Sequence, residues 1–116
     1  MDREERFEKR QWKDAIREIK RAYDQFSDFE WKVANNEPKR AARHLRKAID
    51  DFNAAITHIE KANVGEAGKA AVDEMNHGIK ELDEAVTALD EGDVDTAQRH
   101  YHKAVTRFGK ATTTRG

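Results

Sequence analysis

The sequence has no cysteine and little that interrupts a regular backbone, with one proline and six glycines in 116 residues. Without cysteine, disulfides, thiolate metal sites and thiol catalysis are excluded. No apolar run approaches the roughly 20 residues that a membrane-spanning helix needs. The first nine residues, MDREERFEK, lack the apolar segment of a signal peptide. We therefore expect a cytoplasmic protein.

Charged residues, by contrast, are abundant: they make up 39% of the chain, and apolar residues make up 37%. This balance, with many Ala, Glu, Lys and Arg residues, is typical of amphipathic helices with charged outer faces, so it predicts an all-α fold. The net charge is −1. Any attraction to nucleic acid or to an anionic membrane therefore has to be local.

Three short segments predict turns: ANNEP at 34–38, NVGEAG at 63–68 and DEGDVD at 90–95. They divide the chain into four predicted helices and a frayed tail. The expected helices span about 2–34, 38–63, 66–90 and 93–112, and the tail spans 113–116.

Residue types at the predicted helix ends support these boundaries. Asp2 and Glu5 have the spacing of a capping box. Gly65 and Gly92 stand where left-handed C-terminal caps belong, and Asp93 is suited to cap the N-terminus of the last helix.

The chain contains an internal repeat. A shift of 56 residues aligns 14–55 with 70–111 without gaps and gives nine identities in 42 positions. Large apolar positions also correspond, such as Leu45 with Tyr101. A helical hairpin duplicated once predicts an antiparallel four-helix bundle, here one domain over residues 1–112 with a long first helix.

One segment, GDVDTAQRHYHKAV, resembles the second helix of a tetratricopeptide hairpin at Gly92, Ala97, Tyr101 and Ala104. The resemblance covers about a dozen residues and implies a helical module that binds peptides. The preceding helix has Glu84–Ala85 in place of the Leu-Gly pair of that family, and the repeat length also differs. We attribute the resemblance to the shared packing of helical hairpins.

Metal chemistry has one sequence candidate, the Glu-x-x-His pair of Glu74 and His77. Di-iron bundles need two such pairs and two further glutamates, all facing the bundle interior. The repeat counterparts of Glu74 and His77 are Glu18 and Arg21. We therefore predict no metal site and no cofactor.

A polar cluster of Glu30, His44 and His100 is a second candidate. Glu30 is predicted on the core-facing stripe of the first helix, level with His44 in the hairpin, and the contact could extend to His100 or Tyr101. Such a pair could fix the register of the helices, or it could be a titrating catalytic pair. No glycine-rich phosphate loop is present, so we expect no enzyme and no small-molecule substrate.

Basic residues gather on the outward faces of the second and fourth predicted helices, although the N-terminus of a helix favours acids. The stretch 66–91 carries a net charge of −6, whereas 38–63 and 93–115 carry +3 each. The acidic stretch could neutralise the basic faces, or a phosphate-bearing nucleic acid could bind them. These faces comprise Lys39, Arg40, Arg43, Arg46, Lys47, Arg99, Lys103 and Lys110.

Aromatic residues of the first helix indicate a protein partner. Phe7 lies where this helix should extend beyond the bundle, Trp31 falls off the apolar stripe, and Trp12 lies on the stripe, level with Ile59. Unpartnered Phe7 and Trp31 favour protein–protein association. We expect a scaffold, adaptor or regulatory module that forms a homodimer, with nucleic-acid binding as the alternative and no membrane partner.

Overall fold

The computed structural model describes residues 2–113, which form four α-helices. They are α1 (Arg3–Ala34), α2 (Pro38–Ala62), α3 (Gly65–Asp90) and α4 (Val94–Thr113). Each boundary lies within one residue of its predicted position, and the all-α fold is confirmed. Thr113, expected in the tail, is the last residue of α4, and the rest of that tail lies outside the described residues.

Side chains cap two helices as the sequence predicts. Oδ1 of Asp2 accepts the backbone N–H of Glu5 at 2.8 Å. Asp93 accepts both the backbone N–H and the hydroxyl of Thr96, at 3.1 and 2.7 Å. Both contacts satisfy amide donors that the first turn of a helix leaves without partners.

Residues in the left-handed backbone conformation follow α2 and α3, with one difference from the prediction. Gly92 has φ = 80°, as expected after α3. The residue that ends α2 is Asn63 (φ = 53°), and Gly65 (φ = 71°) begins α3 instead. Asparagine adopts this conformation more readily than other side chains, so it takes the role predicted for the glycine.

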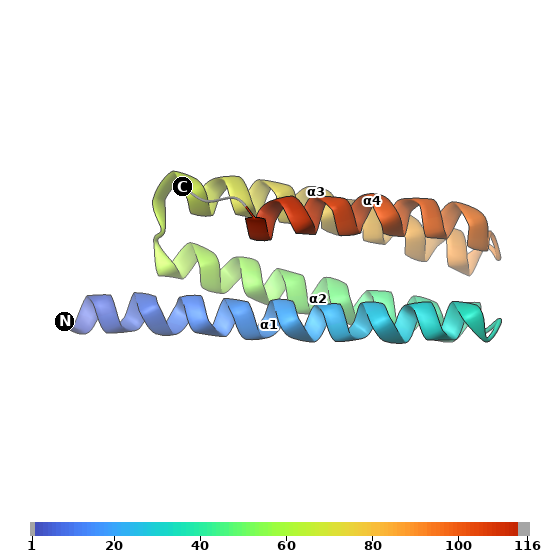
Figure 1. Cartoon of the computed structure of the whole chain (residues 1–116), viewed down its shortest axis with the longest axis horizontal. Helices are drawn as coiled ribbons and strands as arrows, with labels where there is room; N and C mark the ends of the chain where they lie inside the picture. Colours follow the sequence, from blue (N-terminus) through green and yellow to red (C-terminus); the bar gives the residue numbers. More distant parts are fainter. Residues whose placement is uncertain (1, 114–116) are drawn as a thin grey trace.

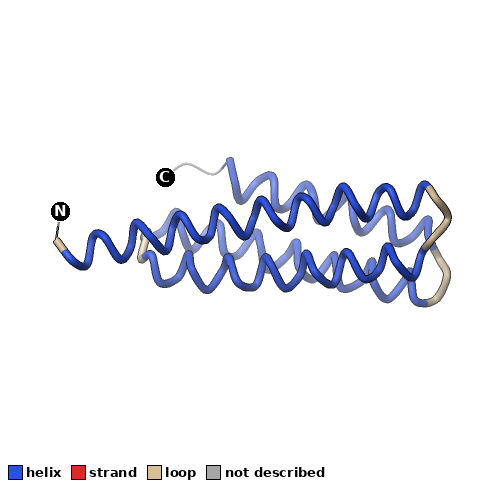
Figure 2. Tube along the Cα trace, turned by 90° about the horizontal axis from the view of Figure 1, so that it is seen from below, coloured by secondary structure: helices blue, strands red, loops and turns tan. Residues whose placement is uncertain are grey.

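The helices run up and down in an elongated bundle of 52 × 19 × 18 Å (Figure 1). The closest packing joins α1 to α2, α2 to α3 and α3 to α4. The N-terminal turns of α1 project beyond the α2–α3 turn (Figure 2), which confirms the long first helix. None of the described helices combines the length and apolar character that crossing a membrane requires.

The core combines alanines, which let helices approach closely, with a central group of aromatic rings. Phe52 and Phe108 stack with ring centroids 3.6 Å apart, and Phe26 lies 5.7 Å from Phe52. Between α1 and α4, the Tyr101 ring packs against Phe26 and Phe29, with ring centroids 5.2 and 4.5 Å apart. These rings fill the side of the bundle where the two helices do not pack closely.

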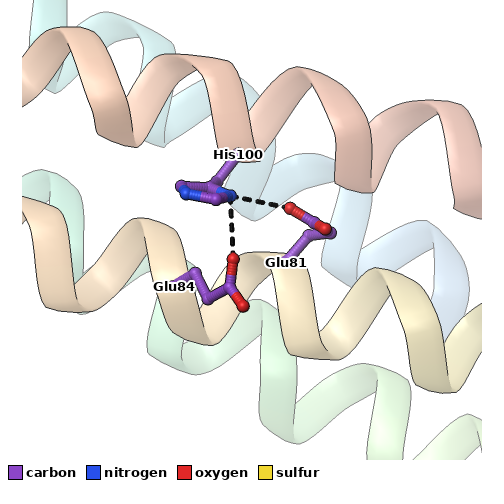
Figure 3. Close-up of side chains that lie close together, drawn as sticks. All are labelled: Glu81, Glu84 and His100. Atoms are coloured by element: carbon purple, nitrogen blue, oxygen red, sulfur yellow. Dashed lines mark hydrogen bonds and ion pairs between the residues drawn. The ribbon is translucent and has the colours of Figure 1, made fainter.

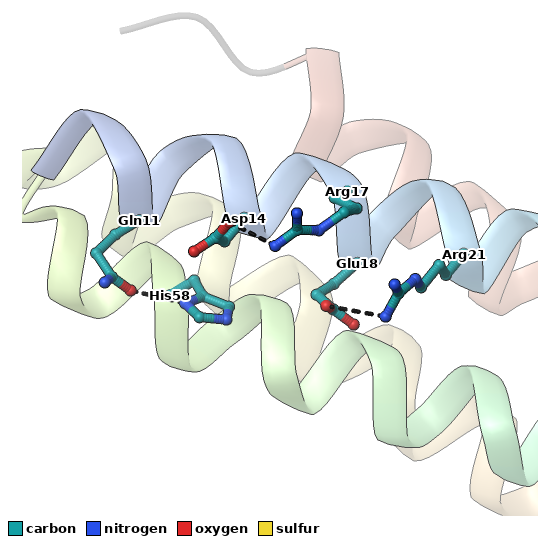
Figure 4. A network of polar contacts seen from close by, with 6 residues as sticks. All are labelled: Gln11, Asp14, Arg17, Glu18, Arg21 and His58. Carbon is teal, nitrogen blue, oxygen red and sulfur yellow. Dashed lines mark hydrogen bonds and ion pairs between the residues drawn. The ribbon is translucent and has the colours of Figure 1, made fainter. Parts of the chain in front are cut away.

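Equivalent polar contacts join the two helices of each hairpin. His44 Nδ1 lies 2.8 Å from Oε1 of Gln25, and His100 Nδ1 lies 2.7 Å from Oε2 of Glu81. The two pairs are offset by the 56 residues of the repeat, which supports the duplication. The first hairpin has one more such contact, between His58 and Gln11 (Figure 4).

Candidate functional site

An apolar groove opens at the end of the bundle where α1 begins. Its volume is about 520 Å³. In the described part of the chain, α4 stops short of the first turns of α1 (Figure 1), which leaves the groove open at this end. The principal apolar side chains that line it are Trp12, Ile16, Ile19, Ile59, Ala71 and Met75.

Large apolar side chains are exposed around this groove. The described part of the chain exposes five of them, and four lie at this end: Phe7, Trp12, Ile16 and Val64. Phe7 is 49% exposed and Trp12 is 42% exposed. Trp12 lines the groove together with Ile59, its predicted neighbour, whereas the described residues that line the hollow beside Phe7 are arginines of α1.

Charge is segregated along the projecting turns of α1. Residues 2–8 contain four acidic and two basic residues, and residues 9–13 contain three basic residues and no acidic one. The first stretch therefore carries −2 and the second +3. A second copy of this helix lying antiparallel would bring each stretch against its opposite.

Trp31 lies at the other end of the molecule, in the last turns of α1, and is 67% exposed. It is 24 residues from Phe7 along one helix, a separation of about 36 Å. The three aromatic residues predicted to bind a partner therefore do not form one patch. Phe7 and Trp12 belong to the groove end, and Trp31 stands apart.

The predicted contact between Glu30 and His44 is wrong. His44 Nδ1 contacts Gln25 and lies 3.8 Å from Oδ2 of Asp28, while the hydroxyl of Tyr101 donates to Oε2 of Glu30 at 2.5 Å. Glu30 is also exposed rather than core-facing. Glu30 extends toward α4, and His44 extends toward an earlier turn of α1.

The contact between Tyr101 and Glu30 has an electrostatic consequence. Burial, and then the hydrogen bond to Glu30, raise the pKa of the Tyr101 phenol. The phenol therefore stays protonated and keeps donating. This favours a structural contact between α1 and α4 over a titrating catalytic pair.

The predicted basic faces are exposed at all eight positions. In the described part of the chain, Lys39, Arg43 and Lys47 make no ion pair, while Arg46 contacts Asp90 of α3 at 2.7 Å. The acidic helix α3 therefore pairs with the basic face of α2 at one position. Most of that face remains open to solvent.

The metal-like cluster of the structure is not the one that the sequence suggested. Glu74 is bound by an arginine of α4, and His77 is exposed. Instead, Glu81, Glu84 and His100 bring three possible ligand atoms within 4.8 Å of one another. Sequence reasoning grouped His100 with Glu30 and His44 and did not consider Glu81 or Glu84 as its partners. The signal was the 56-residue offset, which relates it to the group around His44.

The molecule thus has three surfaces to which a function could belong: an apolar groove, a basic face and a histidine–carboxylate cluster. The groove is suited to apolar side chains of a partner, and the basic face to phosphates. Nothing among known proteins settles the choice, since no family model, curated protein or solved structure matches this chain.

Proposed function

We propose that this protein is a non-enzymatic interaction module that self-associates as a homodimer through the groove end of the bundle. The observation that carries the proposal is the apolar groove lined by the exposed Trp12, Ile16 and Val64, with the exposed Phe7 on the projecting turns of α1 at the same end. Exposed apolar patches of this kind mark sites of association, because burying them removes apolar surface from water.

A second copy of the chain is the partner that best matches this end. The projecting α1 is an amphipathic helix with an exposed phenylalanine and tryptophan. A two-fold axis beside the groove would let each α1 cover the groove of the other copy, with both chains using the same residues. The antiparallel arrangement also pairs the acidic stretch 2–8 with the basic stretch 9–13.

The affinity of this dimer should be modest. Phe7, Trp12 and Ile16 are each about half exposed. Burying them in both copies is worth on the order of 6 kcal/mol before the cost of association is subtracted. Because about 6 kcal/mol lies between the values for 1 μM and 1 mM, and the cost of association reduces it further, the dissociation constant is expected at about 1 mM or above.

Sedimentation equilibrium over a range of concentrations tests the proposal. The natural chain should form dimers, Trp12→Glu should abolish them, and Trp31→Glu at the opposite end should leave them intact. Added salt should weaken the dimer because part of the contact is charged. A chain that stays monomeric at all concentrations refutes the proposal, and so does dissociation by Trp31→Glu rather than by Trp12→Glu.

Nucleic-acid binding through the basic face of α2 is a second candidate, favoured by the exposed Lys39, Arg43 and Lys47, which make no ion pair with the residues that the structure describes. Binding to RNA or DNA should weaken steeply with salt, since each phosphate contact releases counterions. It should be lost in the triple variant that replaces these three residues with glutamate. Binding that ignores salt, or survives the triple variant, excludes this face.

The cytoplasmic location and the absence of catalytic activity stay predictions. A catalytic pair of Glu30 and His44 is not proposed, because the two side chains contact other residues.

A further inference from the structure

Two carboxylates and an imidazole converge between the helices of the second hairpin. Glu81 and Glu84 lie one turn apart on the same face of α3, and His100 reaches them from α4 (Figure 3). Its Nδ1 lies 2.7 Å from Oε2 of Glu81 and 3.0 Å from Oε2 of Glu84. Glu81 and His100 are mostly shielded, while Glu84 borders the solvent.

The first hairpin provides an internal comparison. Shifting the cluster back by 56 residues gives Gln25, Asp28 and His44, and the contact from His44 Nδ1 to the Gln25 amide oxygen measures 2.8 Å. The histidine contact therefore needs only a neutral oxygen as acceptor. Glutamate at 81 adds a second negative charge beside Glu84, and like charges at this spacing destabilise a helix.

A divalent cation would offset that repulsion. In the described part of the chain, both carboxylates have their ion pairs with His100 rather than with lysine or arginine. A metal ion at the centre of the three groups would take the place of the proton on Nδ1 and would balance both carboxylates.

The distances are close to those of a metal site. Zinc binds imidazole nitrogen and carboxylate oxygen at about 2.0–2.2 Å, so tetrahedral ligands stand about 3.3 Å apart. The ligand atoms here lie within 4.8 Å of one another, and glutamate side chains can close such a difference by small rotations. Mixed nitrogen and oxygen ligands favour zinc and similar transition metals, whereas magnesium and calcium prefer oxygen alone.

We propose that Glu81, Glu84 and His100 bind one divalent transition-metal ion of the zinc type, which joins α3 to α4, with water in the remaining position. This site is separate from the self-association proposed above.

Isothermal titration of the full chain with Zn²⁺ tests the proposal. We expect one ion per chain, with Glu81→Gln, the residue type of the first hairpin, lowering the affinity at least about tenfold. His44→Ala removes the equivalent imidazole in the first hairpin and should leave the affinity unchanged. An equal affinity in Glu81→Gln, or an equal loss in His44→Ala, would mean nonspecific histidine binding and overturn the proposal.

Thermal unfolding gives a second readout that does not depend on the heat of binding. Because the ion binds the folded pair of helices, saturating Zn²⁺ should raise the Tm of the natural chain and of His44→Ala. At the same zinc concentration it should raise the Tm of Glu81→Gln less, and Mg²⁺ should raise none of them. An equal rise in Glu81→Gln contradicts the site.

Discussion

Gly78 lies where α3 meets the aromatic centre of the core, and adding one methyl group there should destabilise the fold. A Cβ at this position would stand 2.6 Å from Cζ of Phe108, well inside contact distance. The Phe108 ring cannot move away easily, because it is buried and stacked on Phe52 with an interplanar angle of 6°. Gly78→Ala therefore overpacks the core.

The size of the effect follows from a comparison with Gly109. Both glycines are helical, so alanine should gain about 1 kcal/mol of helix propensity at either position. Among the residues that the structure describes, a Cβ at Gly109 meets nothing within 4 Å, so Gly109→Ala keeps this gain. Overpacking of a core costs about 1–3 kcal/mol. In the difference between the two variants the helix term cancels, and Gly109→Ala should be the more stable by about 1–3 kcal/mol.

Urea unfolding followed by circular dichroism measures this difference directly, with all chains at one concentration because self-association would shift the midpoint. The expected order of stability is Gly109→Ala, the natural chain, and Gly78→Ala. If Gly78→Ala were as stable as Gly109→Ala, the stacked rings of Phe52 and Phe108 would have to move aside without a loss of stability. The account of a tightly packed aromatic centre would then be wrong.

Three further predictions concern other parts of the bundle. Burial and the hydrogen bond to Glu30 raise the pKa of Tyr101 above its usual value of 10.0. Above about pH 10 the folded state therefore keeps a proton that the unfolded chain releases, and the Tm should fall. The fall should be smaller in Tyr101→Phe, which has no phenol to titrate. Asp93→Ala should lower the Tm because α4 loses its cap, whereas Asp93→Asn should retain most of it, since asparagine also caps. Leu45→Ala removes a fully buried side chain and should cost about 2–5 kcal/mol in urea unfolding, with no change in helix content before the transition.

Most of the fold follows from local signals in the sequence. Asparagine or glycine marks each turn, a capping aspartate follows the third turn, and the apolar stripes identify the buried faces, so the helix ends were predicted to within one residue. The left-handed conformation of Asn63 was not predicted, because Gly65 two residues later was expected to adopt it. Both residue types permit that conformation, and the chain uses both.

The candidate sites were harder to predict because they depend on where helices end and which way side chains leave them. Trp12 was expected beside Ile59, and both line the groove, but the groove itself requires that α4 stop short of α1. Glu30 was expected to contact His44, and it contacts Tyr101 of α4 instead. The spacing of apolar residues predicts the position of a residue along its helix more reliably than it predicts which of two neighbouring helices the side chain contacts.

Both proposed sites lie where the two hairpins differ. The projecting turns of α1 precede the repeated region, and Glu81 stands where the first hairpin has Gln25. Features common to both hairpins, such as the histidine contacts, hold each pair of helices together. Folding requires the features that the two hairpins share, but it does not explain why the hairpins differ at the two proposed sites.

Because these differences are at separate places, the two proposals should fail or succeed independently. Trp12 lies in the groove near the start of α1, whereas Glu81 lies between α3 and α4. Trp12→Glu should therefore abolish the dimer without changing zinc affinity, and Glu81→Gln should do the reverse. Sedimentation and titration on both variants measure all four quantities. Loss of zinc binding in Trp12→Glu would mean that the metal site is completed by the second copy, and the single-chain geometry of Glu81, Glu84 and His100 would then be insufficient.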